Sequence, residues 1–353
     1  MDFVHEYWQA IERGDVVVSQ KVSTIYAQLV DEIDNPTGQW VFDEEKALRP
    51  IEFIEKFCRQ SKGEWIGKPL KLELFQKAFI SALFGFVDKD TGFRRYKETL
   101  FLCARKNGKS SLLAAIALYM LTADGEGGAE VYSIATKADQ SRIIFNEAVH
   151  MVQQSPYLSK YIVKRKSDMY MPSTFSTMAP LASETKSLDG LNSHCVVIDE
   201  LHAIRNRELY EIMKQSMAAR RQPLLIMITT AGTVRECIYD DMYDYASQVL
   251  EGTIQDERFL PVMYELDTRD EWTDPSKWMK ANPGLGPIKK YEDLAEKVER
   301  AKNNPKDLPG ILCKDFNIRE TTYDAWVTFE TANNEETFNL EDFRGCYAIG
   351  GAD

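Results

Sequence analysis

The feature that most constrains the fold is a short polar turn between an apolar strand and an apolar helix. We expect the strand at residues 98–103, the turn at residues 104–110 (Ala-Arg-Lys-Asn-Gly-Lys-Ser) and the helix at residues 111–121. The helix is apolar on nearly every side, which is typical of a helix buried beside a sheet. The turn fits the phosphate-binding pattern G-x-x-x-x-G-K-S/T except at Cys103, where the pattern requires glycine. We therefore predict a P-loop nucleotide-binding fold.

The residues of this turn fit contacts with ATP. Gly108 lets the backbone approach the phosphates, Lys109 can neutralise the β- and γ-phosphates, and the Ser110 hydroxyl can bind Mg²⁺. Asn107 and Ser111 join the expected ATP-binding set, because the free amides at a helix N-terminus point toward an anion.

Two cations before the glycine are unusual in a phosphate loop. Arg105 or Lys106 could reach the γ-phosphate and stabilise the transition state, and general attraction of phosphate is the alternative role. We favour Arg105 as the catalytic cation and count both residues as ATP-binding. Lys186 is a further candidate for a cation that acts across a subunit boundary.

A second apolar strand, residues 194–198, ends in the two carboxylates Asp199 and Glu200. An acid at the carboxyl end of a parallel strand faces the crevice where ligands bind. We predict that Asp199 holds Mg²⁺ together with Ser110, and that Glu200 orients and deprotonates the attacking water.

Two further segments are candidates for the same site. Thr229 and Thr230 end another apolar strand, and a hydroxyl there could sense the γ-phosphate and couple it to movement. Gln76 could pair with both edges of adenine, but the sequence alone does not decide between this role and a structural one.

The remaining pattern alternates strands with helices and predicts an α/β fold with a mostly parallel sheet covered by helices on both faces. We expect a helical N-terminal region (1–60), a P-loop ATPase core (61–264), and a lid or linker subdomain (265–335) rich in proline and glycine turns. Smaller expectations concern helix limits: a start marked by Pro50, a capping-box-like start at residues 136–139, and helices near 206–221 and 234–251.

Charge limits the ways in which this chain can contact nucleic acid. The net charge of its 353 residues is −12, whereas a protein that grips duplex DNA passively is basic. Contact with DNA would therefore depend on local patches, for which residues 94–97, 164–166 and 220–221 are the candidates.

The spacing of the cysteines and the hydropathy of the chain indicate its cellular compartment and whether it binds structural zinc. The six cysteines have no paired spacing, so we expect reduced thiols in a cytoplasmic protein. His194, Cys195 and His202 lack a second ligand pair, so we expect no zinc site. No run approaches the ~18 apolar residues of a membrane span, and the N-terminus has no signal-peptide pattern, so we expect no membrane partner.

Taken together, these segments resemble the large terminase subunits of tailed phages, in order along nearly the whole chain. The segments that carry the resemblance are Phe75-Gln76, the phosphate loop with Arg105 near its start, Ser187-Leu188-Asp189-Gly190-Leu191-Asn192, Asp199-Glu200-Leu201-His202-Ala203 and Ile228-Thr229-Thr230-Ala231-Gly232. The resemblance implies Mg²⁺-dependent ATP hydrolysis that drives double-stranded viral DNA into a procapsid, in the cytoplasm of a bacterial host. It implies a portal protein, a terminase small subunit and a homo-oligomeric ring as partners.

In this family the ATPase is joined to an RNase H-like nuclease. Residues 336–353 match the first nuclease strand, whose terminal aspartate, here Asp353, binds catalytic metal. A two-metal nuclease needs several carboxylates, so the site is incomplete; we expect a truncated chain that does not cleave DNA by itself.

Two other functions compete with a terminase motor. A helicase-like DNA-dependent ATPase should have arginine fingers in a second recA-like domain, for which the chain is too short. A nucleotide-gated structural protein would bind ATP without turnover and would not need the base Glu200. Phosphate release with and without DNA separates the three.

Overall fold

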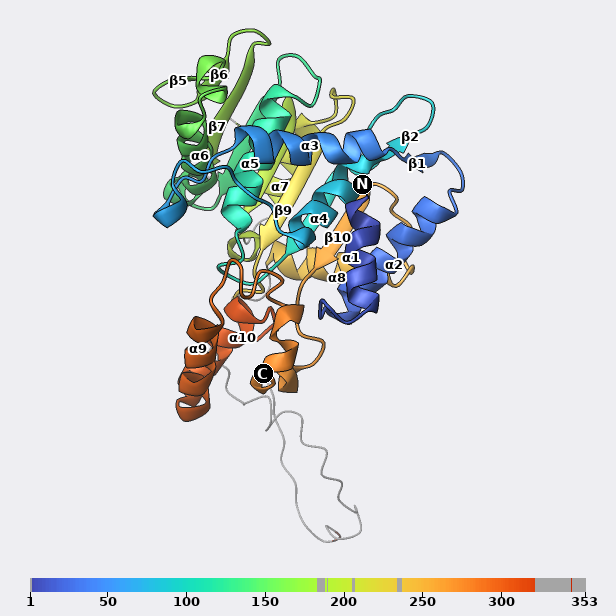
Figure 1. Ribbon diagram of the computed structural model, residues 1–353, viewed down its shortest axis with the longest axis vertical. Coiled ribbons are helices and arrows are strands. Elements are labelled where there is room, and N and C mark those ends of the chain that lie inside the picture. The colour runs from blue at the N-terminus through green and yellow to red at the C-terminus, as the bar shows by residue number, and fades with distance from the viewer. Residues whose placement is uncertain are drawn as a thin grey trace.

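An eight-stranded sheet forms the centre of the molecule (Figure 1). The computed structural model describes residues 2–182, 188, 190–204, 207–233, 237–320 and 344. The strand order is β10-β3-β9-β8-β4-β7-β6-β5; the first six strands are parallel, and β6 and β5 are each antiparallel to their preceding neighbour. The strand bounds are β3 (Glu98–Leu102), β4 (Glu130–Ala135), β5 (Val163–Lys164), β6 (Met169–Met171), β7 (Ser176–Ala182), β8 (Ser193–Asp199), β9 (Leu224–Thr229) and β10 (Phe259–Met263). The α/β fold with a mostly parallel sheet is confirmed.

The register of the parallel strands brings the expected site segments to one edge of the sheet. Leu102 at the end of β3 pairs with Thr229 at the end of β9. Asp199 at the end of β8 pairs with Ile228 of β9. The carboxyl ends of β3, β9 and β8 therefore meet, and this is where open α/β sheets bind their ligands.

Helices cover both faces of the sheet (Figure 1). The helix bounds are α1 (Phe3–Glu12), α2 (Gln20–Asp34), α3 (Glu44–Phe57), α4 (Leu74–Gly85), α5 (Lys109–Thr122), α6 (Ala138–Gln154), α7 (Glu208–Ser216), α8 (Ile238–Leu250), α9 (Tyr291–Asn303) and α10 (Leu308–Asp315). Helices α5 and α6 lie on one face, and α7 and α8 lie on the other, because right-handed crossovers that run in opposite directions along a sheet use opposite faces. Short 3₁₀ turns complete the chain: η1 (Gly63–Trp65), η2 (Leu158–Lys160), η3 (Leu201–Ala203), η4 (Arg269–Thr273), η5 (Pro275–Lys280) and η6 (Pro305–Asp307).

Two hydrophobic cores stabilise the described structure. The larger core surrounds the central sheet and includes the apolar sides of α1 to α8. The smaller core joins side chains from Leu266 to Phe316, with Trp278 and Leu294 among its members. Ala104 of the phosphate turn belongs to this smaller core, so the turn is packed against the C-terminal elements rather than against the sheet alone.

Several local expectations were wrong. Helix α3 begins at Glu44 and not at Pro50, because Asp43 caps the helix by accepting a hydrogen bond from the Lys46 amide (3.0 Å). The N-terminal region also contains a strand, β1 (Trp40–Phe42), which pairs with β2 (Phe86–Asp88).

The capping-box expectation at residues 136–139 was also wrong. The N-cap of α6 is Lys137, and its side chain caps nothing. Helix α7 is shorter than residues 206–221, since it ends at Ser216. In the described part of the chain, no helix has the length and apolar character of a membrane span.

Candidate functional site

The turn between β3 and α5 borders an open cavity of about 480 Å³. Six of the expected ATP-binding residues line it: Arg105, Lys106, Gly108, Lys109, Ser110 and Ser111. The expected base, Glu200, lines it as well. The fold therefore gathers the cations of the phosphate turn and the carboxylate that follows β8 around one space.

The backbone of the turn reverses sharply at Lys106 and Gly108, whose φ angles are 66° and 76°. A Cβ atom on Gly108 would lie 3.2 Å from Gln76 Nε2 and 3.3 Å from Ile288 Cδ1. Both the left-handed backbone and the closeness of these neighbours favour glycine at this position.

Lys109 is folded over the turn. Its Nζ atom donates hydrogen bonds to the carbonyl oxygens of Cys103 (2.5 Å) and Ala104 (2.8 Å). Burial lowers the pKa of Lys109, although the nearby carboxylates of Glu200 and Asp199 favour its charged form. The ammonium group is therefore held at the mouth of the turn, where a phosphate can replace the carbonyl oxygens as its partner.

Asn107 anchors the turn to the C-terminal elements. Its Nδ2 atom donates to Ala104 O (3.0 Å) and Asn282 Oδ1 (3.1 Å), and its Oδ1 atom accepts from the Gly284 amide (2.9 Å). The side chain is buried and Asn107 does not line the cavity, so its expected contact with ATP stays a prediction. The Arg105 amide adds a second link by donating to Lys314 O (2.9 Å).

Arg105 and Lys106 present their side chains to solvent at the cavity. Among the residues that the structure describes, neither guanidinium nor ammonium group has an acidic partner. Two uncompensated cations beside the P-loop leave positive potential where the phosphates of ATP would lie.

Asp199 is the last residue of β8, and Glu200, which follows it, lines the same cavity as Lys109. The Glu200 amide donates to Asp199 Oδ1 (2.9 Å). Burial and the adjacent Glu200 carboxylate raise the pKa of Asp199 to about 6. Glu200 adopts a left-handed backbone conformation (φ 55°), which is uncommon for a residue with a side chain and is found at functional sites.

A chain of contacts joins Glu200 to the end of β9. His202 Nε2 lies 3.1 Å from Glu200 Oε2, and His202 Nδ1 lies 2.8 Å from Thr229 Oγ1. The Thr229 hydroxyl donates to Thr230 O (2.6 Å), so its oxygen accepts from His202. Thr229 thus reaches the expected base through an imidazole.

The loop after β9 is shaped around His202. A Cβ atom on Gly232, whose φ is 60°, would lie 2.3 Å from His202 Cδ2. Only glycine allows this approach without displacing the imidazole. The Thr230 hydroxyl is buried with no hydrogen-bond partner among the described residues.

Gln76 lies behind the phosphate turn, near the start of α4, and is almost fully buried (5% exposed). Its Oε1 atom accepts a hydrogen bond from the Glu73 amide (3.0 Å), which leaves Nε2 beside Gly108. Gln76 does not line the cavity, and its role toward adenine stays a prediction.

Sequence reasoning missed Glu147 of α6, a buried carboxylate that lines the cavity. Ser111 Oγ donates to its Oε1 atom (2.9 Å), Ser61 Oγ donates to the same atom (2.5 Å), and Lys62 Nζ lies 3.2 Å from its Oε2 atom. These contacts outweigh the effect of burial and lower the pKa of Glu147. The sequence signal was a charged residue on the apolar side of a helix.

In two of the three candidate basic patches, arginine side chains are held in contacts within the fold. Arg94 and Arg95 are buried in ion pairs with Asp124 (2.9 Å) and Glu32, which corrects the expectation of a DNA-binding patch at residues 94–97. Arg220 donates to the carbonyl oxygens of Gly127, Gly128 and Asn192, so it serves the fold. Residues 164–166 are exposed.

Two expected site residues, Lys186 and Asp353, lie outside the described residues. The segments 205–206 and 234–236, which belong to expected helices, lie outside them as well.

Comparison with known proteins identifies the family. Residues 74–248 match the family model of the terminase large subunit ATPase domain, and residues 253–353 match that of the terminase large subunit endonuclease domain. The terminase large subunit of Enterobacteria phage HK97 is 29% identical over 286 residues, which cover 79% of this chain and 54% of the relative. Protein YmfN of Escherichia coli K12 is 34% identical over 160 residues, which cover 44% of this chain and 35% of that protein.

The fold comparison agrees. The crystal structure of the HK97 large terminase superposes with a TM-score of 0.68 at 27% identity, covering 78% of this chain and 55% of that chain. The chain spans about half the length of the terminase subunits that it matches. Two adjacent family models, a similar relative and a similar structure agree with the geometry of the cavity: this chain belongs to the family of terminase large subunits.

Proposed function

We propose that this chain is the ATP-hydrolysing motor of a terminase large subunit and that hydrolysis drives double-stranded viral DNA into a procapsid. The observation that supports this most directly is the cavity itself, where a phosphate loop and a strand-end carboxylate, Glu200, face each other. Family membership supplies the packaging context.

The proposed chemistry assigns one role to each group. Lys109, with the amides at the start of α5, binds the β- and γ-phosphates. Glu200 accepts the proton of the attacking water, and His202, whose Nε2 atom lies 3.1 Å from Glu200 Oε2, orients the carboxylate. Arg105 stabilises the charge that develops on the γ-phosphoryl oxygens.

The residues present also fit Mg²⁺. Burial and Glu200 raise the pKa of Asp199, as expected where carboxylates are crowded without a cation, and Ser110 adds a hydroxyl at the cavity. Mg²⁺ held by Ser110 and Asp199 would neutralise phosphate charge during the reaction.

For the whole protein we propose the partners that packaging requires: double-stranded DNA, a portal protein, a terminase small subunit and further copies of the chain in a ring, in the host cytoplasm. We also propose that the whole protein cuts DNA, because residues 253–353 match the endonuclease domain model. Asp353 would be one ligand of the nuclease metal.

Phosphate release with and without duplex DNA tests the motor. We expect ATP turnover by the chain and none by Lys109→Ala, with the circular dichroism spectrum unchanged. Turnover that survives Lys109→Ala would remove the phosphate-loop assignment. ATP binding without turnover would favour a nucleotide-gated structural protein, and turnover that ignores duplex DNA would count against a DNA motor.

A further inference from the structure

Two stretches distant in sequence, residues 56–71 and 157–168, lie side by side on the surface. The rings of Phe57 and Tyr157 meet edge to face with their centroids 5.6 Å apart. A Cβ atom on Gly67 would lie 3.5 Å from the Oε1 atom of Gln154, at the end of α6. We call the surface formed by these two stretches the basic face.

The charge of the basic face is opposite to that of the whole chain. Its two stretches contain nine Lys or Arg residues and two Asp or Glu residues, whereas the chain has a net charge of −12. Lys68, Lys160, Lys164 and Lys166 are exposed and have no ion-pair partner in the described structure. The positive charge is therefore concentrated and largely unneutralised.

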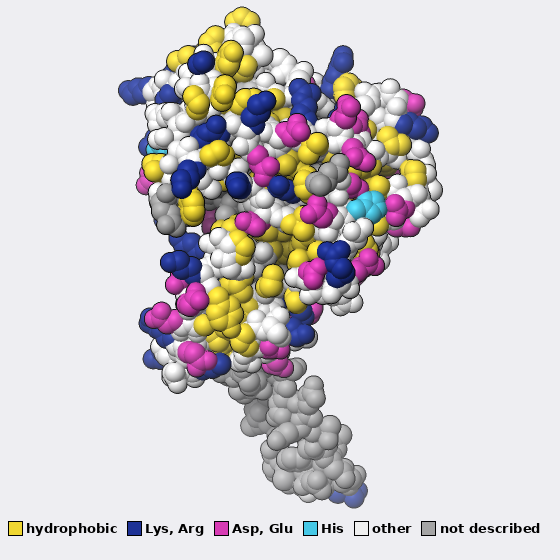
Figure 2. Space-filling view, in the orientation of Figure 1, with side chains coloured by type: hydrophobic (Ala, Val, Ile, Leu, Met, Phe, Trp, Pro, Cys, Tyr) yellow, Lys and Arg dark blue, Asp and Glu magenta, His cyan; other side chains and the backbone are white. Residues whose placement is uncertain are grey.

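Exposed aromatic side chains lie among these cations. Trp65, Tyr157 and Tyr161 are 55%, 50% and 61% exposed, and Lys68 lies 4.3 Å from the centre of the Trp65 ring. Figure 2 shows Lys and Arg mixed with hydrophobic side chains, and few acidic ones, over the part of the molecule that contains α6, β5 and β6. Tyrosine and tryptophan are enriched at interaction surfaces, because each has an apolar ring and a polar group.

We propose that the basic face binds the phosphate backbone of duplex DNA. Unpaired lysines release counterions from DNA when they contact phosphates, and tyrosine hydroxyls donate to phosphate oxygens. The inference rests on the proposed function for its choice of ligand, but the surface itself follows from charge and exposure.

The composition of the basic face favours DNA over a protein partner. Seven of its nine cations are lysine. Lysine is depleted in protein–protein interfaces, where arginine is enriched, because its hydrated ammonium group is costly to bury. A compact, hydrated cation can instead stay at the surface and contact phosphate as a point charge.

The basic face also reaches the nucleotide cavity. Ser61 and Lys62 belong to its first stretch, and both contact Glu147, which in turn holds Ser111 of α5. DNA bound at the face would therefore lie next to a segment that contacts the phosphate-binding helix. This continuity predicts that losing DNA contacts at the face also removes DNA stimulation of ATP turnover.

The test is a triple substitution, Lys160→Ala/Lys164→Ala/Lys166→Ala, in the full chain. Binding of a fluorescent duplex is followed by anisotropy across a salt series. Each lost phosphate contact should reduce the slope of log K against log salt by about 0.9, so the triple variant should lose roughly three units of slope. We expect duplex affinity near 0.1 M salt to fall about tenfold or more, with basal ATP turnover unchanged.

The matched control replaces three exposed lysines at α9 and the following turn η6 by alanine: Lys290→Ala/Lys302→Ala/Lys306→Ala. It removes the same charge from another surface, and we expect duplex binding and its salt slope to stay near the wild-type values. Equal losses in both triple variants would mean that total charge, and not the basic face, governs binding.

The remaining outcomes are separable. If the wild-type chain binds duplex and the basic-face variant binds it equally well, the surface assignment fails while the proposed motor stands. If the wild-type chain hydrolyses ATP but binds no duplex, the DNA part of the proposed function fails and this inference fails with it.

Two outcomes would assign the basic face to another ligand. If the basic-face variant loses binding to a single strand of the same sequence but keeps duplex binding, the duplex assignment is overturned. A changed oligomeric state in sedimentation, with unchanged DNA binding, assigns the face to contacts between copies.

Discussion

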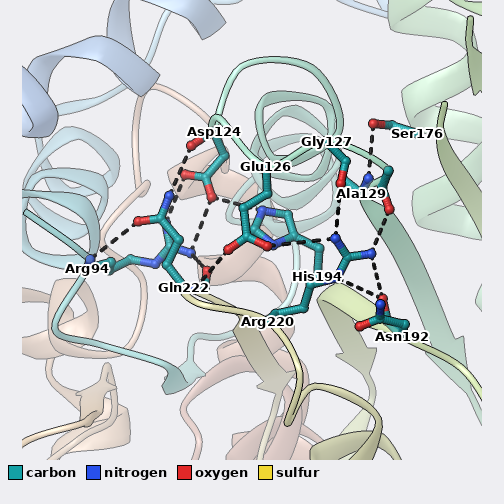
Figure 3. A network of polar contacts seen from close by, with 11 residues as sticks. Arg94, Asp124, Glu126, Gly127, Ala129, Ser176, Asn192, His194, Arg220 and Gln222 are labelled. Carbon is teal, nitrogen blue, oxygen red and sulfur yellow. Dashed lines mark hydrogen bonds and ion pairs between the residues drawn. The ribbon is translucent and has the colours of Figure 1, made fainter. Parts of the chain in front are cut away.

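At the amino ends of β3 and β8, charged side chains are closed into a network of mutual contacts (Figure 3), whereas at the carboxyl ends of the same strands they face an open cavity. Asp124 accepts hydrogen bonds from Arg94 (2.9 Å), and its other oxygen lies 2.9 Å from His194 Nε2. Gln222 completes the network by donating to the Asp124 carbonyl (3.1 Å). The side chains of Arg94, Asp124 and His194 are buried, and Gln222 is partly exposed.

At the carboxyl ends of β3 and β8, charged side chains of the same kinds are not all paired with one another. Arg105 and Lys106 have no acidic partner in the described structure, and Glu200 has a left-handed backbone. One strand and one helix join the two ends: β3 runs from the Arg94 side to the phosphate turn, and α5 runs from Lys109 back to Asp124. Closed charge networks hold the fold in place, while charges left unpaired are available to a ligand.

The largest expected effect is at the open end. Arg105→Ala should bind ATP nearly as well as the wild type but should lose about 10³–10⁵ in turnover, because an arginine that stabilises phosphoryl-transfer charge is worth that much. The free energy of unfolding should not change, since the side chain has no partner among the described residues. Lys106→Ala is the matched control, and we expect it to weaken ATP binding in a salt-dependent way. A fall in affinity with full turnover at saturation would show that Arg105 only attracts phosphate.

Glu200→Gln should come next. We expect retained ATP binding and a loss of roughly 10²–10⁴ in turnover, because the amide cannot accept the proton of the attacking water. Single-turnover hydrolysis and ATP binding should be measured on the same preparation. If Glu200→Gln loses affinity and Asp199→Asn loses turnover instead, the two roles are reversed.

At the closed end, substitution should change stability rather than turnover. Asp124→Asn leaves Arg94 buried without its charged partner, and breaking such a pair costs about 3–5 kcal/mol of unfolding free energy. Urea denaturation measures the loss, and turnover per folded molecule should stay at the wild-type value. A variant that is stable but slow would mean that the two ends of the sheet are coupled and not separate in function.

Acid provides an independent test of the same network. Burial raises the pKa of Asp124, but Arg94 and His194 outweigh it and hold the pKa below its usual value. A carboxyl group whose pKa is depressed by folding stabilises the protein above its unfolded pKa of about 3.9. That contribution is lost as pH falls through the lower, folded pKa. The stability of Asp124→Asn should therefore fall less steeply than that of the wild type below about pH 4.

The smallest expected effect is at Glu147, which contacts Ser111, Ser61 and Lys62 and also lines the nucleotide cavity. Glu147→Ala removes the charge-assisted hydrogen bonds to Ser111 and Ser61 and should raise the KM for ATP about tenfold, with little change in kcat. Glu296→Ala, an exposed carboxylate on α9, is the control. A drop in kcat with unchanged KM would place Glu147 in the chemical step.

The amino-acid sequence by itself determined the strand–turn–helix of the phosphate loop and the carboxylates at the end of β8. Both are local features: a few contiguous residues define the turn, and an apolar run that ends in acids defines the strand end. The alternation of these segments was enough to predict a mostly parallel sheet, because parallel strands need crossover helices. The meeting of the segments at one edge then followed from the rule for parallel strands.

Only the tertiary structure decided which charged and polar side chains form ion pairs and hydrogen bonds within the fold. Arg95 pairs with Glu32, 63 residues away, so a segment that resembled a DNA-binding patch is buried. Asn107 bonds Asn282, 175 residues away, and so anchors the turn to the C-terminal elements. Glu147 reaches Ser61, 86 residues away, and became part of the cavity wall. Local patterns carry no information on partners this distant, because packing of the whole chain selects them.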